Sequence, residues 1–137
     1  MRILIVDDDE NLLEILAEWF EHFEPGTKIH TATCLDQAVT WIPAVDGVLC
    51  DGEFPTHANE CRGLPETRNW AGVPLRCLEV GVPFVLLSGN DHQVRRCRQV
   101  SELSEAGPKI MAFSKPMEVG AACVALIECT KANLATS

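Results

Sequence analysis

The first nine residues, MRILIVDDD, constrain the fold more than any other stretch of the chain. Four apolar residues, Ile3 to Val6, run without interruption into three aspartates, Asp7 to Asp9. An apolar run this short, bounded by polar residues, is typical of a strand that a parallel sheet buries on both faces. Because open α/β sheets bind their ligands beyond the carboxyl ends of the strands, the aspartates fall at the edge where function is expected.

Three adjacent carboxylates also need a chemical explanation. Like charges repel, so a cation is expected beside them, and Mg²⁺ prefers oxygen ligands of this kind. The alternative is an acidic N-cap, since a carboxylate at the start of the next helix interacts favourably with the helix dipole. One aspartate is enough for a cap, so we expect a metal or phosphate role for the rest of the cluster.

Size and charge narrow the class of protein. The 137 residues predict one domain over 1–137, and a net charge of −9 argues against a nucleic-acid partner. No apolar run reaches the roughly 20 residues of a membrane span, and a four-residue run that ends in DDD is not a signal peptide. The seven cysteines are scattered and form no CxxC pair. We therefore expect reduced thiols and a cytoplasmic protein.

The rest of the chain alternates amphipathic helices with short apolar strands. The spacing of apolar residues predicts helices over 11–23, 35–42, 73–80, 90–105 and 117–134, and further strands over 28–32, 48–50, 84–88 and 110–114. Residues 52–71 contain Pro55, Gly63 and Pro65 without periodicity, which predicts a long loop. Together with the first strand this is a (βα)₅ order, so we expect an α/β fold with a parallel sheet between helices.

Chemically versatile residues end four of the five expected strands. The first strand ends in Asp7 and Asp8, the third in Asp51, the fourth in Ser88 and the fifth in Lys115. Because parallel strands end at one edge of the sheet, these side chains are expected to converge. Carboxylates with Mg²⁺ can hold a phosphoryl group, while a hydroxyl and an ammonium contact its oxygens. An aspartate can itself be the nucleophile and form an acyl phosphate, so the pattern predicts phosphoryl transfer.

Several motifs follow one another in a fixed order along nearly the whole chain. They are ILIVDDD at 3–9, Ala32, Asp36 to Val39, DGVLCD ending at Asp51, Pro55, VLLSG ending at Gly89, and SKP at 114–116. In this order they resemble the receiver domain of two-component response regulators (CheY-like). The resemblance implies a flavodoxin-like, doubly wound sheet of five parallel strands in the order 2-1-3-4-5.

The resemblance also implies roles for single residues. Asp51 would be the phosphoacceptor. The Mg²⁺ ligands would be Asp8, Asp51 and the backbone carbonyl of Glu53, with Asp7 assisting through water. Ser88 and Lys115 would contact the phosphoryl group, and the Lys115–Pro116 peptide bond would be cis.

The expected partners are a histidine kinase or histidine phosphotransfer protein and an unknown downstream protein. Since the chain ends shortly after its last helix, we expect a stand-alone receiver that signals through protein contacts. Any activity of its own would be limited to Mg²⁺-dependent self-phosphorylation and autodephosphorylation.

Two features depart from the family pattern. The segment between Asp51 and Ser88 is longer than is usual in the family, and the stretch from Ser88 to Lys115 is also somewhat long. The family usually carries an aromatic residue three positions before the lysine, where this chain has Ala112. Phe113 is one position further on and is expected to point to the other face of its strand.

Two alternatives to a phosphorylated receiver remain. The first is a haloacid-dehalogenase-type phosphatase, with Asp7 and Asp9 as its D-x-D start and with Ser88 and Lys115 as its later hydroxyl and lysine. Asn11 stands where that family has threonine or valine, no acidic pair follows the lysine, and a cap is missing. The second is a degenerate receiver that acts as a constitutive binding module.

Overall fold

The computed structural model describes residues 1–57, 70–103 and 107–136. Its strands are β1 (Arg2–Val6), β2 (Lys28–Ala32), β3 (Gly47–Asp51), β4 (Phe84–Ser88) and β5 (Ile110–Ser114). Its helices are α1 (Glu10–Phe23), α2 (Leu35–Trp41), α3 (Gly72–Val80), α4 (Asp91–Leu103) and α5 (Val119–Ala135), with a short 3₁₀ turn, η1 (Ile42–Ala44), after α2.

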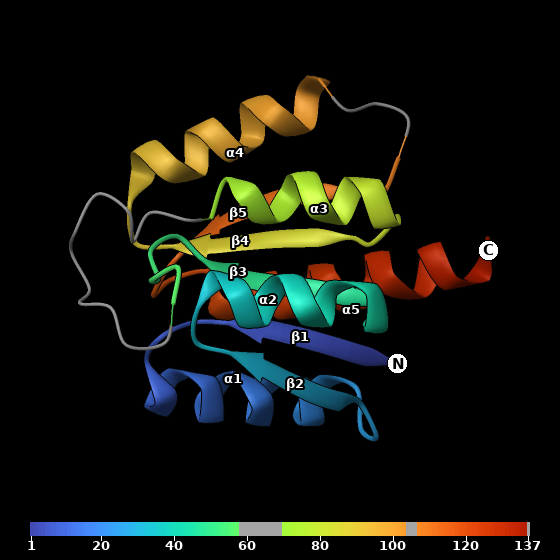
Figure 1. Ribbon diagram of the computed structural model, residues 1–137. Coiled ribbons are helices and arrows are strands. Elements are labelled where there is room, and N and C mark those ends of the chain that lie inside the picture. Colours follow the sequence, from blue (N-terminus) through green and yellow to red (C-terminus); the bar gives the residue numbers. More distant parts are fainter. Residues whose placement is uncertain (58–69, 104–106, 137) are drawn as a thin grey trace.

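The five strands form one parallel sheet in the order β2-β1-β3-β4-β5. The arrowheads in Figure 1 all point to the same edge of the sheet, and the amino terminus lies at the opposite edge. The register is regular: Val6 pairs with Ala32 on one side and with Cys50 on the other. The expected flavodoxin-like α/β fold, including its strand order, is therefore confirmed.

Helices cover both faces of the sheet (Figure 1). Successive side chains of a strand point to opposite faces, so each buried strand contributes to two cores. Leu4 and Val6 of β1 pack in a cluster with residues of α2, α3 and α4. Ile3 and Ile5 of the same strand pack in a second cluster with residues of α1 and α5. This arrangement explains why β1, β3 and β4 are continuous apolar runs rather than alternating ones.

Local chemistry sets where the helices begin and end. Asp9 is the N-cap of α1, since its carboxylate accepts the backbone N–H groups of Asn11 and Leu12 at 3.0 and 3.3 Å. Asn90 caps α4 in the same way, so α4 begins at Asp91 rather than at the expected residue 90. The second helix ends one residue earlier than expected, where η1 starts with Pro43 as its second residue.

Most of the expected loop over 52–71 lies outside the described residues. In its described part, the carbonyls of Pro55 and Thr56 accept the backbone N–H groups of Leu35 and Asp36 at 2.9 and 3.1 Å. The segment after Asp51 is therefore tied to the start of α2. Trp70, at the far end of the expected loop, is buried in the core with α2, α3 and α4.

Two expectations from composition concern thiols and membranes. Six of the seven cysteines lie in the described part of the chain, and all six are free thiols. The seventh, Cys61, lies outside the described residues. Within the part of the chain that the structure describes, no helix combines the length and the apolar character that a membrane crossing requires.

Candidate functional site

Three carboxylates meet at the carboxyl ends of β1 and β3. Oxygens of Asp7, Asp8 and Asp51 all lie within 4.8 Å of one another, and Asp7 and Asp51 are buried. Val6 pairs with Cys50 across the two strands, so Asp7 and Asp51 each follow one member of the same pair. The parallel register therefore brings together residues that are far apart along the chain.

The fifth strand supplies a cation to this carboxylate cluster. The Lys115 Nζ lies 2.7 Å from Oδ1 of Asp51 and 3.8 Å from Oδ2 of Asp7, with 23% of the lysine side chain exposed. The backbone N–H of Lys115 donates to the Ser88 carbonyl at 3.0 Å, which fixes the start of the loop after β5. The Lys115–Pro116 peptide bond is cis. The long lysine side chain thus spans the distance from β5 to the end of β3.

Burial and neighbouring charges change the pKa of Asp7 in this cluster. Burial, and then the negative charge of Asp51, raise the pKa of Asp7 from 3.8 to about 6. The backbone N–H of Asp9, 2.9 Å from Oδ1 of Asp7, and the ammonium of Lys115 oppose that rise. A group of converging carboxylate oxygens suits a hard divalent cation. The donor set therefore fits Mg²⁺, which Asp7, Asp8 and Asp51 would hold.

The hydroxyl at the end of β4 lies in a buried hydrogen-bond cluster. The Ser88 Oγ donates to Oε1 of Gln93 at 2.7 Å and accepts the backbone N–H of Asn90 at 3.0 Å. The Gln93 Nε2 donates in turn to the carbonyl of Gly52 at 3.1 Å. Gly52 directly follows Asp51, so this cluster adjoins the carboxylates.

Gln93 is not among the site residues predicted from the sequence, although the sequence contains a signal for it. Gln93 precedes Cys97 by four positions and Val100 by seven, so all three lie on one face of α4. Cys97 is buried and Val100 packs against the core, which makes a polar residue on the same face notable. A buried amide needs hydrogen-bond partners, and Ser88 and Gly52 provide them.

Ala112 and Phe113 are neighbours on β5, and their side chains lie on opposite faces of the sheet. Ala112 packs with the core under α2, α3 and α4, whereas Phe113 packs with the core under α1 and α5. Phe113 therefore points away from the face that Ala112 occupies, as expected. The Arg98 guanidinium donates to the carbonyl of Ala112 at 3.0 Å. Glu53 is half-buried two residues beyond Asp51, and the metal-binding role of its carbonyl stays a prediction.

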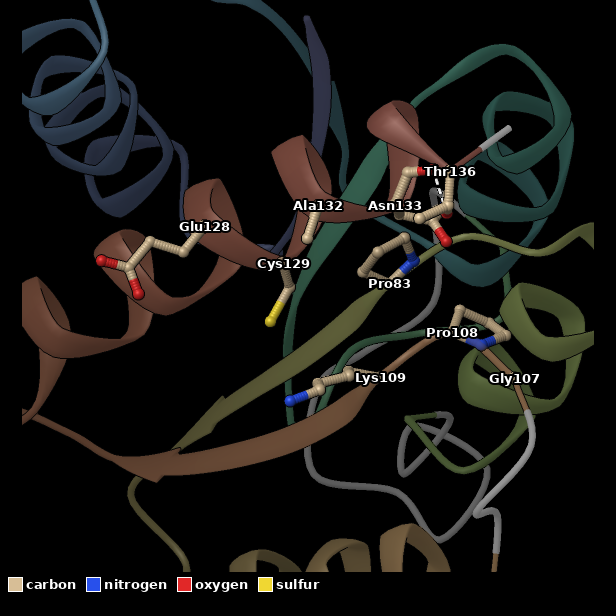
Figure 2. Close-up of a pocket in the computed structure, with 9 residues that line it drawn as sticks. All are labelled: Pro83, Gly107, Pro108, Lys109, Glu128, Cys129, Ala132, Asn133 and Thr136. Carbon is tan, nitrogen blue, oxygen red and sulfur yellow. Dashed lines mark hydrogen bonds between the residues drawn. The ribbon is translucent and has the colours of Figure 1, made fainter.

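A separate hollow of about 380 Å³ opens at the opposite edge of the sheet. Figure 2 shows its lining from the residues just before β4 and β5 and from the last turns of α5: Pro83, Gly107, Pro108, Lys109, Glu128, Cys129, Ala132, Asn133 and Thr136. It lies at the amino ends of the strands, away from the carboxylate cluster. The candidate site is therefore identified by converging charges rather than by the volume of a cavity.

By sequence, neither a family model nor a curated protein matches the chain. By structure, it is similar to a CheY-like response regulator receiver domain protein from Methanospirillum hungatei JF-1. That match has 18% identity and a TM-score of 0.68, and covers 99% of this chain and 98% of that one. A receiver protein from Sinorhizobium medicae WSM419 matches with 18% identity and a TM-score of 0.65, over 97% and 96% of the two chains.

A de novo designed Rossmann 2x3 protein is also similar, with 12% identity and a TM-score of 0.65 over 93% of this chain and 89% of that one. A designed scaffold shares the architecture, so the architecture alone does not assign a function. The matches to the receiver proteins extend over nearly the full length of both chains. They agree with the strand order observed here. This chain therefore has the fold of the response regulator receiver domains, with an acidic cluster and a lysine at the carboxyl edge of its sheet.

Proposed function

We propose that the chain is a response regulator receiver in which Asp51 accepts a phosphoryl group. The observation that carries this proposal is the 2.7 Å contact between Lys115 Nζ and Asp51 Oδ1 inside a cluster of three carboxylates. A nucleophilic carboxylate, an acidic metal site and an ammonium are the parts that phosphoryl transfer requires. The receiver fold supports the same assignment.

The reaction we propose forms one bond and breaks one. A carboxylate oxygen of Asp51 attacks phosphorus, and the bond between phosphorus and the donor breaks. The bonding electrons leave with the imidazole nitrogen of a phosphohistidine or with the carboxylate of acetyl phosphate. Mg²⁺ supplies neutralisation of the phosphoryl oxygens when it is bound. The Lys115 ammonium and the Ser88 hydroxyl would contact two further phosphoryl oxygens.

The phosphoryl donor would be a histidine kinase or a histidine phosphotransfer protein. An added phosphoryl group brings negative charge to a cluster that already holds three carboxylates, two of them buried. That charge shifts the balance between conformations of the surrounding loops. We propose that a downstream protein recognises the shifted conformation, because the net charge of −9 disfavours nucleic acid.

The test is incubation with acetyl phosphate and Mg²⁺, followed by intact-mass measurement. The wild-type chain is expected to gain one phosphoryl group, and Asp51→Asn is expected to gain none. Asp46→Asn is the matched control, since Asp46 lies just before the other end of the same strand and accepts the backbone N–H of Arg2. An unmodified wild type, or an adduct on Asp51→Asn, would refute the proposal.

The phosphatase alternative requires Asp7 and Asp9 to act on one substrate. Asp9 instead caps α1 and is outside the group of carboxylates that converge in the described part of the chain. Turnover of p-nitrophenyl phosphate that is lost in Asp7→Asn and kept in Asp51→Asn would favour the phosphatase. A constitutive binding module would show neither Mg²⁺ binding nor an adduct.

A further inference from the structure

The side chain of Gln93 links two segments on either side of the proposed phosphoacceptor. Gln93 lies in the first turn of α4 and is 7% exposed. Its amide contacts Ser88 at the end of β4 and Gly52 immediately after β3. Both hydrogen bonds are buried, so water does not compete for them and their geometry is well defined.

The chemistry of the partners fixes the direction of each hydrogen bond. The carbonyl of Gly52 can only accept, so the Gln93 amide nitrogen faces it and the amide oxygen faces Ser88. The Ser88 hydroxyl already accepts the N–H of Asn90, and it donates its single proton to Gln93. In this arrangement the Ser88 hydroxyl has no proton left for another acceptor.

The packing around Gly52 makes this arrangement tight. A Cβ atom at position 52 would overlap Oε1 of Gln93 and lie 2.7 Å from Oγ of Ser88. Gly52 is therefore required for Gln93 to approach the backbone this closely. The amide fills the space next to the carboxylate cluster that a side chain at position 52 would occupy.

We propose that Gln93 is a positioning residue that withholds the Ser88 hydroxyl from the phosphoryl group until Asp51 is modified. The inference rests on the proposed function, because it concerns the hydroxyl that would contact the phosphoryl oxygens. Those oxygens only accept hydrogen bonds, so Ser88 must donate to them, and it must first break its bond to Gln93.

The change of hydrogen-bond partner by Ser88 has a structural consequence for α4. Once Ser88 turns to the phosphoryl group, Oε1 of Gln93 loses its buried donor, which is an unfavourable state for a polar atom. The Gln93 side chain therefore moves, and its bond to Gly52 is broken with it. Because Gln93 belongs to the first turn of α4, the charge change at Asp51 is transmitted to that helix.

The test compares rates of adduct formation with acetyl phosphate and Mg²⁺ by intact mass. Gln93→Met keeps the shape of the side chain but cannot hold Ser88, so its rate is expected to rise about three- to tenfold, the effect of one hydrogen bond. Gln99→Met is the matched control, because Gln99 is exposed on the same helix, and its rate is expected to equal that of the wild type.

The second comparison is made in a Ser88→Ala background. In that background Gln93→Met is expected to leave the rate of adduct formation unchanged, since Gln93 acts through the Ser88 hydroxyl. An equal gain in both backgrounds, or no gain with Ser88 present, would overturn the role of Gln93 and leave the phosphoacceptor assignment intact. A wild-type chain that forms no adduct would overturn both proposals.

A measurement on the wild type avoids any change in folding that the variants cause. The side-chain amide signal of Gln93 in a nitrogen–proton correlation spectrum is expected to shift when the adduct forms, while that of Gln99 stays in place. A Gln93 signal that does not move as the adduct accumulates would overturn the inference.

Discussion

The ammonium of Lys115 lies 2.7 Å from Oδ1 of Asp51, across 64 residues of chain. The same Nζ is 3.8 Å from Oδ2 of Asp7. One cation therefore offsets the repulsion between two buried carboxylates on neighbouring strands. This relationship links the stability of the fold to the proposed chemistry of the site.

Replacement of Lys115 by alanine is expected to lower the free energy of unfolding by about 1–3 kcal/mol in the absence of divalent metal, because two carboxylates lose the cation beside them. Urea unfolding measures the change. Lys115→Arg keeps the charge and is expected to lose less. Lys109→Ala, just before the other end of β5, is the control for loss of an exposed lysine, and equal losses at both positions would contradict the prediction.

Mg²⁺ is expected to stabilise the folded chain through the carboxylate cluster. At ten times its dissociation constant, a ligand that binds only the folded state adds about 1.4 kcal/mol. The midpoint of thermal unfolding should therefore rise with Mg²⁺ and fall again with a chelator. Asp8→Asn is expected to abolish the rise, whereas Glu14→Gln on the exposed side of α1 should keep it. A rise that survives Asp8→Asn would place the metal elsewhere.

The metal-free chain is expected to lose stability as the pH rises from 4 to 6. The pKa of Asp7 is about 6 when folded, against 3.8 as the ordinary value, so in this window the folded state keeps a proton that the unfolded state has lost. Asp7→Asn should reduce this slope and raise the free energy of unfolding at pH 7 by roughly 1–3 kcal/mol. Urea titrations at a series of pH values from 4 to 7 measure the slope and the free energy of unfolding at pH 7.

Gly52→Ala is expected to destabilise the fold by about 1–3 kcal/mol, because its new methyl group would overlap the Gln93 amide. The double variant Gly52→Ala with Gln93→Ala should recover part of that loss, since the smaller side chain vacates the space. Gly72→Ala is the control, as an added Cβ there meets no atom within 4 Å. A loss at position 52 that Gln93→Ala does not reduce would show that the clash lies with another group.

Three buried thiols are expected to resist alkylation in the native chain. Burial raises the pKa of Cys77, Cys97 and Cys123 to about 12, against an ordinary value of 9.0. The free energy of unfolding should therefore fall between pH 9 and 12, where unfolded thiols ionise and folded ones do not. Iodoacetamide labelling at pH 8, counted by mass with and without urea, tests their protection. Rapid labelling of all three without urea would contradict it.

Much of the architecture follows from local patterns. Short apolar runs separated by amphipathic helices predict five parallel strands, and the structure confirms them. The order of the strands was implied by the resemblance to receiver domains, and it is confirmed as well. The ends of the helices depended on single residues: Asn90 caps α4 and Pro43 ends α2 early. These details are harder to predict, because one side-chain hydrogen bond decides between neighbouring positions.

The three aspartates at the start of the chain combine a role that the sequence predicts with a division of roles that it does not. The sequence offers a metal site and a helix cap as explanations of the three aspartates. In the structure, different aspartates take the two positions. Asp9 caps α1, while Asp7 and Asp8 turn to Asp51. The division depends on how β1 leaves the sheet, which the order of residues alone does not specify.

The sequence by itself determined the strands, the helices and the polar residues at the strand ends, because periodicity and strand polarity are local properties. Only the tertiary structure decided that Lys115 contacts Asp51 and that the Gln93 amide oxygen accepts a hydrogen bond from the Ser88 hydroxyl. Those contacts join residues from different elements, and their geometry depends on the register of the sheet and on how α4 packs against it.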